Sequence, residues 1–161
     1  MNNGSILKDI GDYKNTLLST LVSSDEICEL LFHKNPYTED DVTNLIYTQI
    51  FPYLYKDETQ AEVKTYICME VDVSEIPTNT VKNMKLILWV YSHKDDMEYS
   101  KEDYSGTKVD ILADMIERKL RSSDEFGIGK LQLQSVVHFN PSDNYYGKRL
   151  IYKIPTFKLS R

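Results

Sequence analysis

The chain has 161 residues, of which 41% are hydrophobic and 27% charged, and its formal net charge is -6 at pH 7. The acidic balance argues against general nucleic-acid binding, because phosphates repel an acidic chain. No apolar run reaches the ~18 residues that a membrane-spanning helix needs, so we expect no membrane partner. This length favours one domain, residues 1–161, built around one core.

The two cysteines, Cys28 and Cys68, lie in segments whose apolar residues recur periodically. We predict two buried free thiols rather than a disulfide or a metal-binding pair. Such thiols are typical of a protein that is made in a reducing cytoplasm.

The first third of the chain has the periodicity of helices. Apolar residues recur at helical spacing over residues 5–22, which predicts a first helix. Ser23 and Glu26 have the spacing of a capping box, which predicts a second, short helix directly after them. Thr38 precedes three acidic residues and predicts the start of a third helix, which Pro52 ends.

From residue 64 the apolar residues alternate, as they do in strands with one buried face. Four strands are predicted, at residues 64–73, 84–92, 131–139 and 149–157. Residues 74–83 contain Pro77 and two asparagines, so they are predicted to form a loop. Thr107 is predicted to cap a helix over residues 108–121, with Asp110 three positions after it.

These patterns predict an α+β fold, in which N-terminal helices precede a mainly antiparallel four-stranded sheet with helices packed on it. The helical part covers about residues 5–52, and the sheet-plus-helix part covers about residues 64–158. The helix over residues 108–121 should pack on the sheet through its apolar stripe, which consists of Val109, Leu112, Ile116 and Leu120.

The sequence carries no recognisable catalytic or metal-binding spacing. The three histidines, His33, His93 and His138, are far apart and form no metal-ligand motif. His33 and His93 lie at loop edges, which suits a solvated imidazole, whereas His138 lies in a predicted strand. Gly127 and Gly129 follow a helix and precede a strand, which reverses the order of a phosphate-binding loop. We therefore expect no catalytic residue, no metal site and no cofactor.

Two other roles for acidic side chains stay open. Asp95 and Asp96, with Glu98, could attract a cation, although a solvated charged loop explains them as well. A metal-dependent hydrolase or nuclease could use Glu70, Asp72 and His93, if the two strand-borne carboxylates faced a metal ion.

Opposite charges gather in two separate segments of the chain. Residues 95–103 contain five acidic side chains and one lysine, whereas residues 146–161 contain five basic side chains and no acid. Complementary patches suit a head-to-tail contact between subunits, which closes a ring when it is repeated with rotation. We expect the two segments to lie on different faces of one subunit and to meet between neighbours. The predicted interface residues are Asp95, Asp96, Tyr99, Tyr104, Tyr145, Tyr146, Lys148 and Arg149.

Several stretches of the chain resemble neck proteins of tailed bacteriophages. They are IFPY, TYICMEVDV, KLILWVYSHKDDM, SGTKVDILADMIERKL, EFGIGKL and YYGKRLIYKIPTF, which together cover most of residues 45–158. The resemblance is closest to small proteins of the head–tail junction, of the tail-terminator or head–tail connector kind.

This resemblance implies an α+β fold, a hexameric ring stacked between portal and tail tube, and no catalysis. The chain is then expected to be a structural virion protein, made in the cytoplasm of the host bacterium, that terminates the tail or joins it to the head. Its partners would be copies of itself and other neck and tail-tube proteins, with DNA passing through the ring unread. A head-completion adaptor is the alternative within this class, and the metal-dependent hydrolase or nuclease is the alternative outside it.

Overall fold

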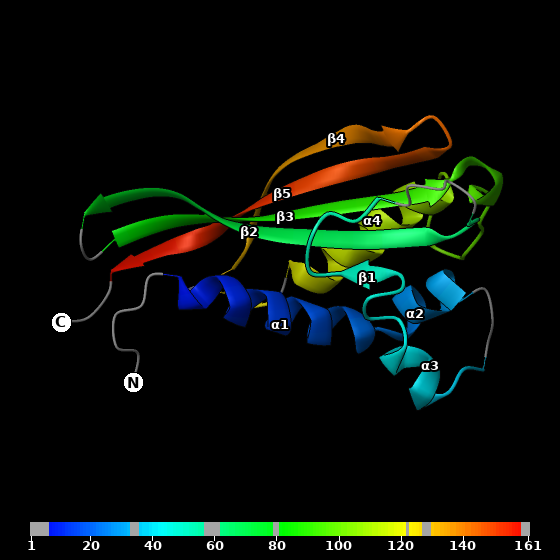
Figure 1. Cartoon of the computed structure of the whole chain (residues 1–161), viewed down its shortest axis with the longest axis horizontal. Helices are drawn as coiled ribbons and strands as arrows, with labels where there is room; N and C mark the ends of the chain where they lie inside the picture. The colour runs from blue at the N-terminus through cyan, green and yellow to red at the C-terminus, as the bar shows by residue number, and fades with distance from the viewer. Residues whose placement is uncertain are drawn as a thin grey trace.

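The computed structural model describes residues 7–32, 36–56, 62–78, 81–121, 123–126 and 130–158. It confirms the α+β class: one sheet packs against helices (Figure 1). The helices are α1 (Lys8–Val22), α2 (Asp25–Phe32), α3 (Glu39–Thr43) and α4 (Lys108–Leu120), with a short 3-10 turn, η1 (Lys94–Asp96). The strands are β1 (Ile50–Phe51), β2 (Thr65–Thr78), β3 (Val81–His93), β4 (Gln132–Ser142) and β5 (Tyr145–Lys158).

The described residues form a sheet of five strands in the order β1-β2-β3-β5-β4, one more than the four predicted. Strand β1 pairs parallel with β2, and every other neighbouring pair is antiparallel. The sheet is therefore mixed. Strand β5 lies between β3 and β4, although β4 precedes it in the chain.

The loop predicted over residues 74–83 was wrong for 74–78 and 81–83, because β2 continues to Thr78 and β3 begins at Val81; residues 79–80 lie outside the described residues. The two strands form one long hairpin, which projects beyond the start of α1 (Figure 1). Register shifts on either side of Glu75 mark bulges in the hairpin. Pro77 lies where β2 has no outer neighbour among the described residues, and proline, which lacks an N–H, is tolerated at such a sheet edge and at bulges.

One face of the sheet, here called the helix face, packs against α1, α2 and α4. Its buried side chains from the three central strands include Met69, Leu88 and Tyr152. The predicted stripe of α4 is confirmed, since all four of its residues are at most 2% exposed. Cys28 is buried in this core and Cys68 on the opposite face, and both are free thiols as predicted.

The opposite face, here called the open face, carries a cluster of aromatic side chains at one end. There the ring of Tyr55 stacks on the ring of Phe51, a residue of β1, with centroids 4.1 Å apart. Beside them Tyr66, Tyr91 and Tyr145 form a buried aromatic cluster. Further along the face, Ile87 and Ile151 are half-buried, and the half-buried Trp89 packs against the aromatic cluster.

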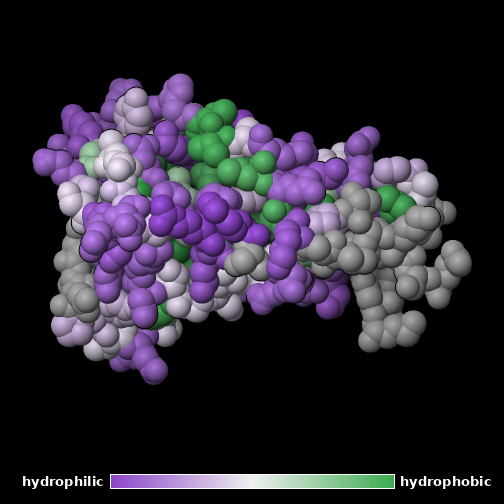
Figure 2. Space-filling view, turned by 180° about the vertical axis from the view of Figure 1, so that it is seen from behind, coloured by the Kyte–Doolittle hydropathy of each residue, from purple (hydrophilic) through white to green (hydrophobic). Residues whose placement is uncertain are grey.

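Strand β4 forms the outer edge of the sheet, and its residues from Gln132 to Val137 are exposed or half-buried. Its large exposed hydrophobic side chains are Leu133, Val136 and Val137, at 40%, 46% and 42% exposure. Figure 2 shows a hydrophobic patch on the upper side of the molecule, the side that β4 borders in Figure 1.

The helical segment before the sheet differs in detail from the prediction. Ser24, not Ser23, caps α2, because the Ile27 N–H donates to Ser24 Oγ at 3.4 Å. The capping box of Thr38 with Asp41 is present.

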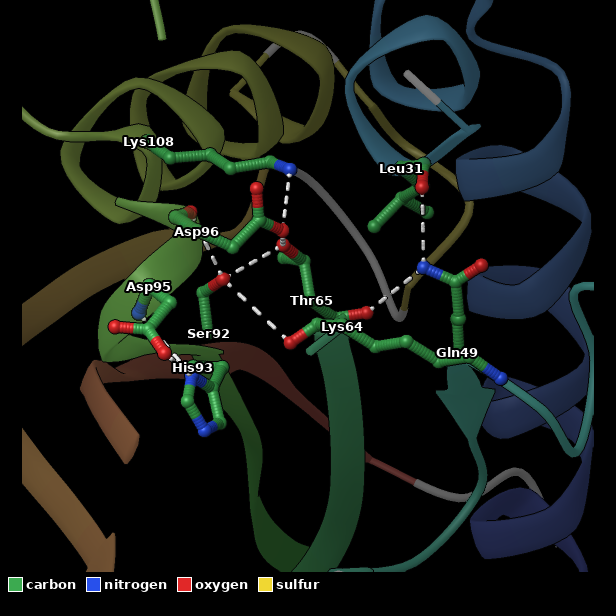
Figure 3. Close-up of polar contacts among 9 residues, drawn as sticks. All are labelled: Leu31, Gln49, Lys64, Thr65, Ser92, His93, Asp95, Asp96 and Lys108. Carbon is green, nitrogen blue, oxygen red and sulfur yellow. Dashed lines mark hydrogen bonds and ion pairs between the residues drawn. The ribbon is translucent and has the colours of Figure 1, made fainter. Parts of the chain in front are cut away.

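The third helix ends at Thr43, however, instead of continuing toward Pro52. Beyond it Tyr47 has a φ of 69°, which a continuing helix does not allow. The chain then extends into β1, and Gln49 Nε2 ties it to α2 and β2 by donating to the carbonyls of Leu31 and Thr65 (Figure 3).

Candidate functional site

Asp96, predicted to be an interface charge, is an internal anchor of the loop that follows β3. Its carboxylate lies 2.8 Å from the Nζ of Lys108, whose side chain is fully buried at the start of α4 (Figure 3). Thr65 Oγ1 also donates to this carboxylate at 3.3 Å. Burial lowers the pKa of Lys108, and the hydrogen bond to Asp96 opposes that shift. Asp96 therefore holds the loop against α4 and β2 and does not project toward a partner.

Asp95, the neighbouring residue, is exposed. Its side chain is 68% exposed, while its backbone N–H donates to Nδ1 of His93 at 3.1 Å. The imidazole of His93 lies edge-on against Tyr145 and is only 6% exposed. The expectation that His93 is solvated was therefore wrong. Asp95 stays a candidate interface residue.

The two tyrosines of the loop are held against the body of the protein. The Tyr104 hydroxyl donates to Glu26 at 2.7 Å, and the Arg118 guanidinium lies 4.2 Å from the centre of its ring. Tyr99 is half-buried and packs against the main core. The long charged segment is therefore folded onto α2 and α4, and its tyrosines offer a partner only part of their surface.

The adjacent residues Tyr145 and Tyr146 lie on opposite faces of β5. Tyr145 is 2% exposed, and its hydroxyl donates to the Glu62 carbonyl at 2.7 Å. Tyr146 is 55% exposed. Tyr145 therefore belongs to the aromatic cluster and cannot meet a partner in this fold, whereas Tyr146 can.

Lys148 and Arg149 also diverge. Lys148 lies on the helix face, where its Nζ is 3.2 Å from Asp110 at the start of α4. Burial alone would raise the pKa of Asp110, but hydrogen bonds from Thr107 and Lys148 lower it below its usual value. Arg149 lies on the open face, opposite Trp89 in register, and its Nε has no hydrogen-bond partner among the described residues.

The acidic loop and the start of β5 do not lie on different faces, contrary to the prediction. The Lys94 N–H donates to the Asn144 carbonyl at 2.8 Å, so the start of the loop lies against the β4–β5 turn. A groove of about 380 Å³ runs between the two segments, and its lining includes Met97, Tyr146 and Lys148. The sequence could not show this, because the juxtaposition depends on β5 pairing with β3.

The structure does not bring His93 to the two carboxylates of the hydrolase or nuclease alternative, Glu70 and Asp72. The His93 N–H donates to the Lys64 carbonyl, so His93 lies level with residue 64 of the neighbouring segment. Glu70 is six residues further along β2, or about 20 Å away at the usual rise per strand residue. The parts of the chain that the structure describes hold no group of three potential metal-ligating side chains. His138 is exposed on β4, and His33, Gly127 and Gly129 lie outside the described residues.

The feature that sequence reasoning missed is the chemical character of β4. Residues 131–142 contain no lysine, arginine, aspartate or glutamate. Edge strands usually carry charges or proline that prevent other strands from pairing with them. In β4 the single proline, Pro141, lies near the end of the strand. The missing charges were visible in the sequence, but the position of the strand at the edge was not.

Comparison with known protein families adds one finding. The sequence model of the YomW family matches residues 24–154, which is most of the chain. The chain belongs to the YomW family. This family is named after a gene product of a Bacillus prophage region, which points to a phage-associated origin. No curated protein matches the chain.

The YomW match begins at the residue that caps α2 and ends near the end of β5. It therefore includes both outer strands of the sheet and the buried pair Asp96–Lys108, and it leaves out α1. Among the described residues no helix is long and apolar enough to cross a membrane.

Proposed function

We propose that the chain is a structural virion protein of the phage neck, where it forms a hexameric ring that terminates the tail or joins it to the head. The phage-associated family and the resemblance of residues 45–158 to neck proteins support this proposal. The protein would be made in the cytoplasm of the host bacterium. In the virion it would contact copies of itself and other neck and tail-tube proteins, and DNA would pass through the ring without sequence-specific recognition.

The observation that carries the proposal is the uncharged, exposed edge strand β4. A strand edge presents unpaired N–H and C=O groups, which pair readily with another strand. Beside this edge, Val136 and Val137 expose almost half of their surface. An edge of this kind is a liability in a protein that stays alone, and it is useful in one whose edge is permanently covered in an assembly.

Deletion of the coding sequence from the phage genome tests the proposal. Electron microscopy should then show filled heads and separate tails, and mass spectrometry should detect the chain in wild-type virions at the copy number of a ring. Heads that lose their DNA would instead support the head-completion adaptor. A chain that is absent from wild-type virions would contradict both structural roles.

Two exposed valines provide a matched pair for complementation of this deletion. Val136, on β4, is 46% exposed, and Val63, outside the sheet, is 51% exposed. Val136→Lys places a charge at the proposed edge and should fail to restore joined particles. Val63→Lys adds the same charge elsewhere and should restore them. Equal complementation by the two variants would contradict a role for the β4 edge.

A further inference from the structure

The sheet has a second free edge besides β4. Strand β1 pairs with β2 only at Ile67 and Cys68, and Lys14 reaches over the edge to Glu70 at 2.7 Å. From Val71 to Pro77, β2 has no neighbour on its outer side among the described residues. The described part of the chain therefore carries two free edges, this one and the outer edge of β4, which has 11 residues.

The strand directions allow these two edges to pair antiparallel between neighbouring copies. Strands β2, β3, β5 and β4 alternate in direction, so β4 runs antiparallel to β2 of the same chain. In a ring whose axis lies roughly along the strands, each copy keeps the same strand direction. The β4 strand of one copy then meets β2 of the next copy as an antiparallel pair.

The charges on the open face are arranged to suit this contact and to oppose one alternative. Near the free edge of β2 lie Asp72 and Glu75, while β5, next to β4, carries Arg149 and Lys153. Pairing of β2 with β2 of another copy would set acids against acids, which is unfavourable. Pairing of β4 with β2 instead sets the acidic row about 10 Å, or two strand spacings, from the basic row of the neighbour.

The β4 side chains between these rows carry no like charge that would oppose their approach. On the open face, Val137 lies opposite Arg149 and Gln132 opposite Lys153, with the short, neutral Ser135 between them. The long side chain of Arg149, whose Nε lacks a hydrogen-bond partner among the described residues, can extend across β4 toward the neighbour's acids.

The helix face of β4 also fits the same neighbour. Leu133 and Val136 lie on that face, opposite Tyr152 and Leu150, and both are about half exposed. Helix α1 packs against β2 on the helix face, so α1 of the next copy would lie beside these two side chains. Burial of their apolar surface would stabilise the contact.

We propose that the outer edge of β4 pairs antiparallel with residues 71–77 of β2 in a second copy of this chain. Repetition of this contact builds one continuous sheet around the ring. That the ring closes is taken from the proposed function. The new element is the pair of surfaces that meet, the outer edges of β4 and β2.

Cross-linking between introduced cysteines tests the inference with the full-length chain. Val137 on β4 and Asp72 or Glu75 on β2 are accessible positions on the open face. The two natural cysteines are buried, and burial raises the pKa of both thiols, that of Cys68 to about 11, so the wild-type background should be low. The reagent is a bismaleimide that spans roughly two strand spacings.

The double variants Val137→Cys/Asp72→Cys and Val137→Cys/Glu75→Cys should give a ladder of covalent oligomers larger than a dimer. A mixture of the corresponding single variants should give dimers only, and each single variant alone should give monomers. Lys119→Cys on the exposed side of α4, combined with Asp72→Cys, is the control and should not cross-link. Dimers from Val137→Cys alone would show a two-fold β4–β4 contact and would overturn the inference.

The same variants are cross-linked inside purified phage particles, which separates this inference from the proposed function. Particles that contain the chain but yield no β4–β2 product would overturn the inference and leave the neck assignment intact. A product that joins Val137→Cys to a different virion protein would also overturn it. Wild-type particles without the chain would refute the neck assignment, whatever the isolated chain does.

Discussion

Asp96→Ala should destabilise the fold by about 3–5 kcal/mol, because it leaves a buried lysine without its partner. The Lys108 side chain is fully buried, and its Nζ lies 2.8 Å from the Asp96 carboxylate. The electrostatic part of the penalty has a ceiling at pH 7. A lysine with an ordinary pKa of about 10.4 loses its proton at a cost of about 1.4 kcal/mol per pH unit, or roughly 4.6 kcal/mol in all. The deficit of the variant should therefore shrink as the pH rises from 7 toward 10.

Urea denaturation followed by far-ultraviolet circular dichroism measures this effect. Asp95→Ala is the matched control, because Asp95 is the adjacent residue and its side chain is 68% exposed. Its loss should stay below about 0.5 kcal/mol. Replacing both partners, as Asp96→Ala with Lys108→Met, should recover part of the stability by removing the unpaired charge. If Asp96→Ala and Asp95→Ala cost the same, Asp96 is not a buried anchor.

Two further predictions concern packing and pH. Gly147→Ala should cost about 1–3 kcal/mol or more, since a Cβ there would overlap the Val90 carbonyl and lie 2.5 Å from Tyr91 Cβ. In Gly11→Ala, in α1, the added Cβ meets no atom within 4 Å, so this variant should gain about 0.5–1 kcal/mol of stability. Equal urea midpoints for the two variants would contradict the tight packing at Gly147. Burial raises the pKa of Tyr91 and Tyr152, and burial and Glu26 raise that of Tyr104 to about 12. These phenols keep protons that the unfolded chain releases above about pH 10, so stability should be full below that pH and fall as the pH rises toward 12. Tyrosinate absorbance should then appear together with unfolding. Ionisation of all tyrosines near pH 10, in a chain that keeps its native circular dichroism, would refute the prediction.

Elements with local signals could be predicted from the sequence. Helix α4 has its cap, Thr107 with Asp110, and its apolar stripe within one continuous segment. Predictions from local residue preferences were wrong where pairing between strands determines the structure. Pro77 indicated a loop, yet its segment continues as strand because it pairs with β3 on one side and leaves the other side free.

The candidate interface was predictable only in part, because exposure depends on distant residues. Nothing near Asp96 in the sequence indicates that Lys108 is buried beside it. Tyr145 and Tyr146 are neighbours in the sequence, and only the pairing of β5 with β3 decides which of them is buried. The charge-free segment that forms β4 could be recognised, but its place at the edge follows from the insertion of β5 beside β3.

The central position of β5 also governs the order in which this protein can fold. During synthesis β3 emerges well before residues 145–158, and until then its buried residues Leu86, Leu88 and Val90 have a partner strand on the β2 side only. Pairing of β5 with β3 closes the long connection between the two strands, which is entropically costly. This pairing should therefore form later and more slowly than the β2–β3 hairpin. The nascent chain therefore exposes an unpaired strand flank for as long as β5 is missing, and it depends during that interval on chaperones or on rapid completion to avoid aggregation.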